Sequence, residues 1–293
     1  MKIIFKIWRL GFPLWLVLAV VGCGSRQIVL ARSRLMMGHV PVNVQIRTQA
    51  TEKGRALVAS EGAYQEAGRL EALLSEYQAD SEISCLNREA GRRSCPLSPE
   101  TMEVLKRSLY FHEQTEGAFD IRFLSKDARG RGGKIQLNEK SHEGFLADPM
   151  TRIGLGAIAK GYIVEAMSAY LRRQGFPDHL INGGGDLLAR GGSWEVGLQV
   201  PGGAPGEFVE ERKLKDLGVS TSGNYEQGAH ILDPRSGEHV QRSGGVTVIG
   251  PDLTTADALA TSFFVLGKAE AAKVVKNFPG LKMIWVDPSV QRP

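Results

Sequence analysis

The sequence predicts one α+β domain, built from mixed sheets and packed helices, behind a separate N-terminal segment. Of the 293 residues, 42% are hydrophobic and 23% are charged, which is enough apolar material for a sizeable core. Segments with strand-like alternation and segments with helical apolar spacing both occur along the chain. No linker rich in Pro and Ser and no internal repeat divides it. We therefore expect a single domain.

The first half of the domain is expected to contain one strand and three helices. Apolar and polar residues alternate over 40–46, with Pro41 confined to the start, which predicts a strand. Ser98 and Pro99 form a cap and first-turn pair for the second helix. The third helix is expected at about 158–174, followed by Gly175 as a C-terminal cap. The first helix carries apolar residues at helical spacing: Ala63, Ala67, Leu70, Leu74 and Tyr77.

The second half is expected to contain short strands and two further helices. The helices are predicted at about 255–266 and 269–278. The strands are predicted at 194–200, 219–221, 230–233, 246–249 and 282–286.

The N-terminus predicts export and a lipid anchor. A basic start leads into an apolar run over 10–21 that is too short to span a bilayer comfortably, which is the layout of a signal peptide over 1–22. The sequence that ends at Cys23 resembles a bacterial lipobox, so lipidation is expected at Cys23, with a tether over 23–35 and the domain over 36–293. A plain signal peptide or an uncleaved anchor is the alternative, because Pro13 interrupts the run. The expected location is the periplasmic side of a cell membrane.

The charge of the chain gives no reason to expect nucleic-acid binding. The formal net charge is +4, but Lys2, Lys6 and Arg9 lie in the first 22 residues, which contain no acid. A processed chain would therefore be close to neutral.

Cys85 and Cys95 remain after processing, and two alternatives are open for them. In an oxidising compartment they can close a short disulfide loop; otherwise they are two free thiols. No Cys or His spacing typical of zinc or iron–sulfur sites is present.

Two of the unusual segments suggest where phosphate and a cation would bind. The segment 155–162 has small residues that permit close backbone approach, and Lys160 lies in the first turn of the helix that follows, a natural seat for phosphate oxygens. Asp257 and Thr261 are four residues apart and so share one helix face. A carboxylate and a hydroxyl placed in this way suit a hard cation such as Mg²⁺.

Individual candidate residues, taken one at a time, also have a plain structural interpretation. His230 alone would be a hydrogen-bonded strand histidine, and Asp257 a cap for the helix near 255. Tyr77 and Phe119 would be core aromatics, and Lys160 a solvated residue on a helix surface.

Six motifs taken together are similar to those of the ApbE family of FAD:protein FMN transferases. They occur in family order from about residue 36 to 266, together with the segments 37–39 and 75–84. No single motif is decisive, but the combination is highly specific. The motifs are GAFD at 117–120, GAIAKGY at 156–162, NGGGD at 182–186, TSGNY at 221–225, HILDPRSG at 230–237 and ADALAT at 256–261.

The resemblance implies a role for particular residues. It implies that FAD is the substrate and that Mg²⁺ is bound by the backbone carbonyl of Ala157 and by Asp257 and Thr261. His230 matches the histidine proposed as general base. The residues that it implies for the flavin site are Met37, Tyr77, Ala118, Phe119, Asp120, Lys160 and Ile231.

Two departures from the family pattern bear on these roles. Gly154 stands where an acid is usual, which removes a carboxylate expected near the nucleotide and would lower affinity or rate. Glu165 stands where an Asp is common, which keeps the charge.

The resemblance implies that FMN is transferred from FAD to a Thr or Ser of an acceptor flavoprotein, with release of AMP. The expected acceptor is a subunit of a membrane electron-transfer complex. Three alternatives remain open: an FAD pyrophosphatase, a lipoprotein that binds FAD without catalysis, and a partner scaffold for an electron-transfer complex.

Overall fold

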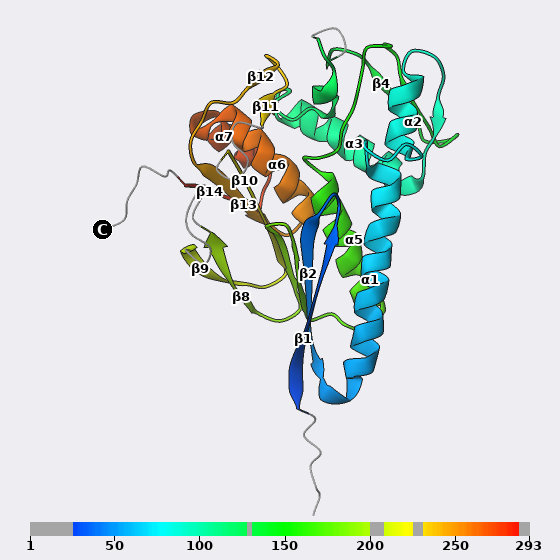
Figure 1. Cartoon of the computed structure of the whole chain (residues 1–293). Coiled ribbons are helices and arrows are strands. Elements are labelled where there is room, and N and C mark those ends of the chain that lie inside the picture. Colours follow the sequence, from blue (N-terminus) through cyan, green and yellow to red (C-terminus); the bar gives the residue numbers. More distant parts are fainter. Residues whose placement is uncertain (1–25, 128–130, 200–207, 225–230, 287–293) are drawn as a thin grey trace, which may run out of the picture.

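A seven-stranded antiparallel sheet forms the centre of the molecule (Figure 1). The computed structural model describes residues 26–127, 131–199, 208–224 and 231–286. Each strand pairs antiparallel with its neighbours, although the spatial order departs from the chain order. In spatial order the strands are β1 (Gln27–Met36), β2 (Val40–Gln49), β6 (His179–Gly183), β7 (Asp186–Arg190), β10 (Leu217–Gly223), β13 (Gly245–Gly250) and β14 (Lys282–Val286).

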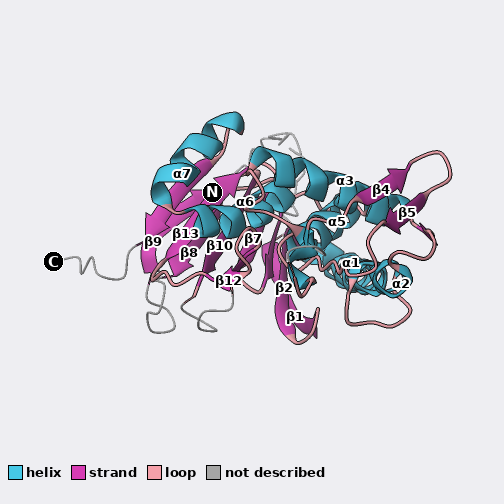
Figure 2. Cartoon of the chain, turned by 90° about the horizontal axis from the view of Figure 1, so that it is seen from above, coloured by secondary structure: helices cyan, strands magenta, loops and turns pink. Residues whose placement is uncertain are grey.

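Helices line one face of this sheet (Figure 2). α5 (Ala159–Arg173) contacts both α1 (Lys53–Leu74) and α6 (Leu253–Leu266), so the three helices form one layer. α6 is apolar nearly all round and is almost entirely buried, as expected for a helix that lies in the core. α7 (Lys268–Val274) and a short 3₁₀ turn, η3 (Val275–Asn277), follow it.

Smaller elements complete the domain. One end carries α2 (Glu82–Glu89), α3 (Pro99–Gln114) and a three-stranded sheet of β3 (Cys95–Pro96), β5 (Glu143–Leu146) and β4 (Ile135–Asn138). The ribbon of β8 (Trp194–Gln199) and β9 (Phe208–Leu214) packs Trp194, Val196 and Leu214 against the strands in a second, smaller apolar cluster. The remaining elements are η1 (Ala50–Glu52), η2 (Ile121–Leu124), β11 (Leu232–Asp233) and β12 (Glu238–His239).

The predicted fold class is confirmed, and several local signals behave as expected. Ser98 caps α3 by accepting a hydrogen bond from the Thr101 N–H, with Pro99 in the first turn. The strand predicted at 282–286 is β14. α6 begins two residues earlier than predicted, because Asp252 accepts hydrogen bonds from the Thr254 and Thr255 N–H groups. Asp257 is therefore not the cap of α6. His230, at the start of one predicted strand, lies outside the described residues.

The tether predicted over 23–35 is wrong for its second part. Residues 27–36 form β1, which pairs with all of β2. β1 lies at the edge of the sheet, and Leu30 is buried while most of its neighbours are exposed. An edge strand of this kind has little apolar periodicity to reveal it in a sequence. The folded domain thus includes residues from Gln27 onward.

Cys85 and Cys95 form a disulfide, which settles the alternative left open above. The bond joins α2 to β3, with the two Cα atoms 6.2 Å apart. Among the residues that the structure describes, no helix has the length and apolar character needed to cross a bilayer.

Candidate functional site

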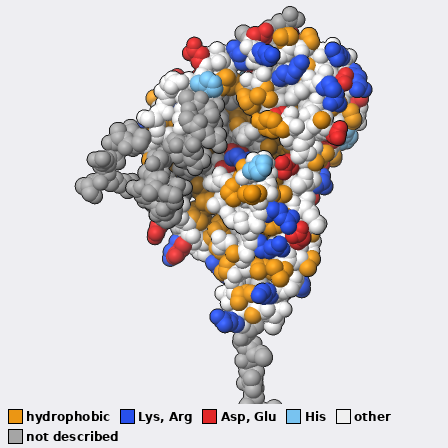
Figure 3. Space-filling view, viewed as in Figure 1, with side chains coloured by type: hydrophobic (Ala, Val, Ile, Leu, Met, Phe, Trp, Pro, Cys, Tyr) orange, Lys and Arg blue, Asp and Glu red, His pale blue; other side chains and the backbone are white. Residues whose placement is uncertain are grey.

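A cavity of about 900 Å³ opens on one face of the molecule. Its wall is formed by the turn after β1, by segments near 118–123 and 154–160, by the turn after β6, and by residues of β10 and α6. The space-filling view shows this face hollowed near its centre, where charged side chains adjoin hydrophobic ones (Figure 3).

Most of the predicted site residues lie on the wall of this one cavity. The residues that do so are Tyr77, Ala118, Phe119, Asp120, Ala157, Lys160, Ile231, Asp257 and Thr261. Met37 is not on the described wall: it packs against the core, and its neighbours Gly38 and His39 line the cavity instead. His230 cannot be placed, because it lies outside the described residues. The chain thus brings segments that are far apart in sequence to one cavity.

Asp257 joins the start of α5 to the middle of α6. Its buried carboxylate accepts a hydrogen bond from the Gly161 N–H through Oδ2, at 2.9 Å. The two helices are very close here, because a Cβ on Gly161 would lie 2.7 Å from the Leu253 carbonyl oxygen and 2.9 Å from the Asp257 Cβ. A glycine is required at 161 for this approach. The Gly161 of the AKGY motif therefore places a carboxylate at the N-terminus of α5.

Lys160 lies between two buried acids. Its ammonium contacts Asp186 Oδ2 and lies 3.7 Å from Asp257 Oδ1. Burial raises the pKa of Asp257 to about 7, with a further contribution from the negative charge of Asp186. Burial alone would lower the pKa of Lys160, but the charges of Asp186 and Asp257 outweigh it and hold that pKa above its usual value. Lys160, Asp186 and Asp257 together carry a net charge of −1 when all three side chains are ionised.

Asp186 was not among the predicted site residues, although the NGGGD motif pointed to its segment. Gly184 and Gly185 have φ values of +65° and +98° and form the two-residue turn between β6 and β7. A Cβ on Gly184 would lie 2.5 Å from Val40 Cγ1, so the turn is tightly packed. This turn sets Asp186 at the start of β7, beside Lys160. Only the tertiary structure shows that contact.

The oxygen atoms near Asp257 suit a hard cation. Ala157 lies before the start of α5, and the Gly161 N–H, four residues further on, donates to Asp257. Thr261 Oγ1 lies 3.1 Å from Ser222 Oγ of β10, a second polar neighbour that the sequence did not reveal. Within the described ranges, no three His, Cys, Asp or Glu side chains gather in metal-binding geometry. Magnesium is usually held by only one or two protein carboxylates. A donor set of one carboxylate, a hydroxyl oxygen and a carbonyl oxygen therefore fits this ion.

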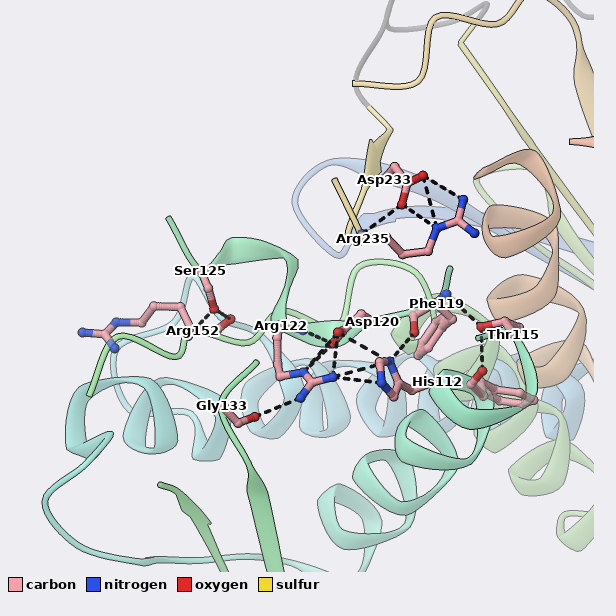
Figure 4. A network of polar contacts seen from close by, with 11 residues as sticks. His112, Thr115, Phe119, Asp120, Arg122, Ser125, Gly133, Arg152, Asp233 and Arg235 are labelled. Atoms are coloured by element: carbon pink, nitrogen blue, oxygen red, sulfur yellow. Dashed lines mark hydrogen bonds and ion pairs between the residues drawn. The ribbon is translucent and has the colours of Figure 1, made fainter. Parts of the chain in front are cut away.

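Asp120 makes contacts that fix the backbone of its own turn (Figure 4). Its carboxylate accepts hydrogen bonds from Arg122 Nε and Nη2, both at 2.8 Å. His112 Nδ1–H donates to the Phe119 carbonyl at 3.1 Å, and Arg122 Nη2 donates to His112 Nε2 at 3.0 Å. Phe119 is buried and packs edge-on against Phe111. The Asp120 side chain therefore holds the 117–122 backbone as one wall of the cavity.

The β1–β2 turn is strained. Met37, Gly38 and His39 all have positive φ, at 47°, 71° and 80°. Non-glycine residues in this region cost of order 1 kcal/mol each. The Met37 N–H donates to Glu71 Oε2 of α1 at 3.0 Å, which holds the turn. This contact keeps Gly38 and His39 on the cavity wall.

Glu165 contributes to packing rather than to the cavity wall. Its carboxylate accepts hydrogen bonds from Arg190 at 2.9 Å and from the Leu253 N–H at 2.8 Å. Burial raises the pKa of Glu165, and these hydrogen bonds oppose the rise. Glu165 thereby ties α5 to the start of α6 and to β7.

Comparison with known proteins identifies the family. The model of the ApbE family matches residues 37–285. An FAD:protein FMN transferase of Treponema pallidum (strain Nichols) is 28% identical over an alignment of 333 positions, which covers 96% of this chain and 91% of that protein. One of Klebsiella pneumoniae (strain 342) is 29% identical over 251 residues, which cover 74% of this chain and 78% of that protein.

The fold agrees with solved structures. The flavinyl transferase ApbE of Pseudomonas stutzeri, in its apo form, aligns with a TM-score of 0.75 at 22% identity and covers 89% of this chain and 95% of that one. The ApbE protein of Thermotoga maritima aligns with a TM-score of 0.73 at 24% identity. These similarities concern the fold alone. Because the family model spans most of the sequence, this chain belongs to the ApbE family.

Proposed function

We propose that this protein is an FAD:protein FMN transferase, which binds FAD and Mg²⁺ and attaches FMN to a Thr or Ser of an acceptor flavoprotein with release of AMP. The observation that carries the proposal is the contact between Asp257 and Gly161, 96 residues apart, beside Lys160 and the N-terminus of α5. This contact brings oxygen donors, the Lys160 ammonium group and the N–H groups at the start of α5 to the same wall of the cavity. A cavity of about 900 Å³ is also of the size that encloses a large ligand.

The residues on this wall have complementary roles in binding a diphosphate. Lys160 and the N-terminus of α5 attract phosphate oxygens. Ala157, Asp257 and Thr261 would hold magnesium through their oxygen atoms, with Asp186 as a neighbouring carboxylate. When bound there, the ion neutralises charge on the diphosphate.

The proposed transfer is a displacement at the flavin-side phosphorus of FAD. The acceptor hydroxyl oxygen forms a bond to that phosphorus, and the bond to the bridging oxygen breaks. AMP leaves with the bridging oxygen, and the hydroxyl proton passes to His230 in its proposed role as base. A histidine with an ordinary pKa near 6.5 can accept this proton at neutral pH. Water in place of the hydroxyl would give hydrolysis to FMN and AMP.

We further propose that the chain is exported and anchored at Cys23 on the periplasmic side of a cell membrane, where it would modify a membrane electron-transfer subunit. The disulfide between Cys85 and Cys95 supports export, because such bonds persist in oxidising compartments. The anchor itself lies outside the described residues.

The test uses the soluble domain with FAD, Mg²⁺ and a peptide that carries an acceptor Thr. Transfer predicts AMP and a fluorescent peptide in equal amounts. AMP with an unlabelled peptide would show a hydrolase, and bound FAD without AMP would show a binding protein. We expect Asp257→Ala and His230→Ala both to abolish transfer, and only Asp257→Ala to weaken metal-dependent FAD binding strongly. Full turnover by His230→Ala would remove that residue from the role of base.

A further inference from the structure

The first strand begins at an end of the molecule that has no part in the cavity. The starts of β1 and α1 lie together at the bottom of Figure 1. The Ala50 N–H of η1 donates to the Arg26 carbonyl at 2.8 Å, directly before β1. Arg55 Nη2 donates to the Gln174 carbonyl at 3.4 Å, directly after α5. We call this end the basal surface, formed by Arg26, residues 50–58 and residues 172–178.

The length of β1 separates the basal surface from the cavity. The strand runs from Gln27 to Met36, and the turn that follows it brings Gly38 and His39 to the cavity wall. Ten strand residues at about 3.3 Å each span roughly 33 Å. A partner that covers the basal surface therefore leaves the cavity open.

The basal surface carries excess positive charge. Its acids are already paired: Asp178 lies 3.0 Å from Arg47, and Glu52 forms an ion pair with Arg55. By contrast Arg26, Lys53 and Arg172 are exposed, and none of them forms an ion pair with another residue that the structure describes. These cations are free to attract an anionic partner.

The nearby turn between β9 and β10 does not alter this charge balance. It places Lys215 next to Asp216, and both are exposed. The turn therefore adds no net charge.

Exposed apolar side chains lie beside these cations. Val58 is 74% exposed and Leu57 is 37% exposed, both near the start of α1. A shallow groove of about 320 Å³ runs along this part of the surface, and Arg55 lies over the Phe176 ring within it, at 5.5 Å from the ring centre. Free cations beside exposed aliphatic groups suit the headgroup region of a lipid bilayer.

The start of β1 also limits how far this end can lie from a membrane. Only three residues separate Cys23 from Gln27, so even a fully extended chain spans at most about 14 Å between them. An uncleaved apolar run over 10–21 would likewise end a few residues before β1. Either attachment keeps the basal surface close to the bilayer.

We propose that the basal surface rests on anionic lipid headgroups, with β1 directed away from the bilayer and the cavity facing the acceptor protein. The proposal rests on the membrane attachment that forms part of the proposed function. Basic side chains near an anionic bilayer are attracted to it, and a short attachment raises their local concentration there. The cavity then lies on the order of 30 Å from the headgroups, which is the height at which an acceptor residue has to be presented.

The test is sedimentation of the chain with lipid vesicles. The chain used starts at Gly24 and carries no lipid, and it keeps every described element from β1 to β14. Vesicles of phosphatidylcholine alone are compared with vesicles of equal parts phosphatidylcholine and phosphatidylglycerol. We expect the wild type to bind the anionic vesicles and to be released by high salt, because salt screens exposed charges.

Charge removal identifies the surface. Lys53→Gln combined with Arg172→Gln is expected to bind the anionic vesicles about 30-fold more weakly, at about fivefold for each charge. Lys53→Arg combined with Arg172→Lys keeps both charges and should bind like the wild type. The matched control is Arg92→Gln combined with Lys140→Gln, two exposed cations beside the three-stranded sheet, which should also bind like the wild type.

Two results would overturn the proposal. One is a wild type that shows no preference for the anionic vesicles. The other is an equal loss of binding in the basal and control double variants, since that would show attraction by net charge without a preferred surface.

The attachment is measured separately, by the mass of the N-terminal peptide of the full chain produced in cells. A lipid on Cys23 together with no vesicle preference refutes only the basal surface. A vesicle preference without the lipid refutes only the proposed anchor. FMN transfer to a soluble peptide does not depend on either result.

Discussion

The carboxylate of Asp257 caps α5 from another helix: its Oδ2 lies 2.9 Å from the Gly161 backbone nitrogen. Helix N-termini leave N–H groups without partners, and an acid at that position also complements the helix dipole. The contact therefore holds two helices in register and places one carboxylate oxygen beside Lys160, 3.7 Å from its ammonium.

Gly161→Ala tests this close approach. The added methyl group would meet the Leu253 carbonyl oxygen at 2.7 Å, and backbone cannot move aside as a flexible side chain can. We expect a loss of about 1–3 kcal/mol in the free energy of unfolding and a marked loss of FAD binding. Urea unfolding measures the first.

Gly54→Ala in α1 is the matched control, because nothing lies within 4 Å of its added Cβ. We expect that variant to be as stable as the wild type or slightly more so. Equal stabilities of Gly161→Ala and Gly54→Ala would contradict the tight helix contact.

His179 is expected to contribute a loss of stability in mild acid, opposite in sign to the contribution of Asp257, whose pKa burial raises to about 7. The buried His179 ring donates from Nδ1 to the Phe176 carbonyl at 2.8 Å and accepts at Nε2 from Ser168 at 2.7 Å, so the ring is neutral. Burial lowers the pKa of His179 to about 4. The unfolded chain therefore binds a proton that the folded chain does not as the pH falls from about 6.5 to 4, and about 3 kcal/mol of stability is lost across that window.

Denaturant unfolding between pH 7.5 and 4 measures the effect. His179→Gln is expected to flatten this part of the profile, whereas His142→Gln, at an exposed histidine, should leave it unchanged. A stability difference between the wild type and His179→Gln that stays constant from pH 6.5 to 4 would show that His179 does not couple protonation to folding.

The disulfide predicts non-additive effects at Cys85 and Cys95. Closing a loop of ten residues stabilises a fold by about 3 kcal/mol through the unfolded state. The single variants Cys85→Ser and Cys95→Ser and the double variant should all lose a similar amount, and reductant should lower the unfolding midpoint of the wild type only. Additive losses, or a wild type that is insensitive to reductant, would show that the bond does not form.

Local signals in the sequence predicted the elements that depend on local chemistry. The cap at Ser98 and Pro99 marked the start of α3, and the strand predicted at 282–286 is β14. The sequence did not reveal β1, because the edge strand buries little more than Leu30. It placed the start of α6 near 255, since Asp252 was not recognised as the cap.

The site was predicted in part, and its missing members are tertiary contacts. Motifs indicated Lys160 and Asp257, but their partner Asp186 becomes apparent only when β7 folds beside α5. Asp120 was expected to line the flavin site, and it does line the cavity, but its carboxylate is engaged by Arg122.

Calorimetric titration of FAD with and without Mg²⁺, into the wild type and Asp257→Asn, tests the central claim most directly. Asparagine keeps an oxygen for the Gly161 N–H, so the helices stay together while the charge is removed. We expect Mg²⁺ to tighten FAD binding at least tenfold in the wild type and to have no effect in Asp257→Asn. An Asp257→Asn variant that retains the full magnesium dependence would contradict the claim that this carboxylate holds the ion.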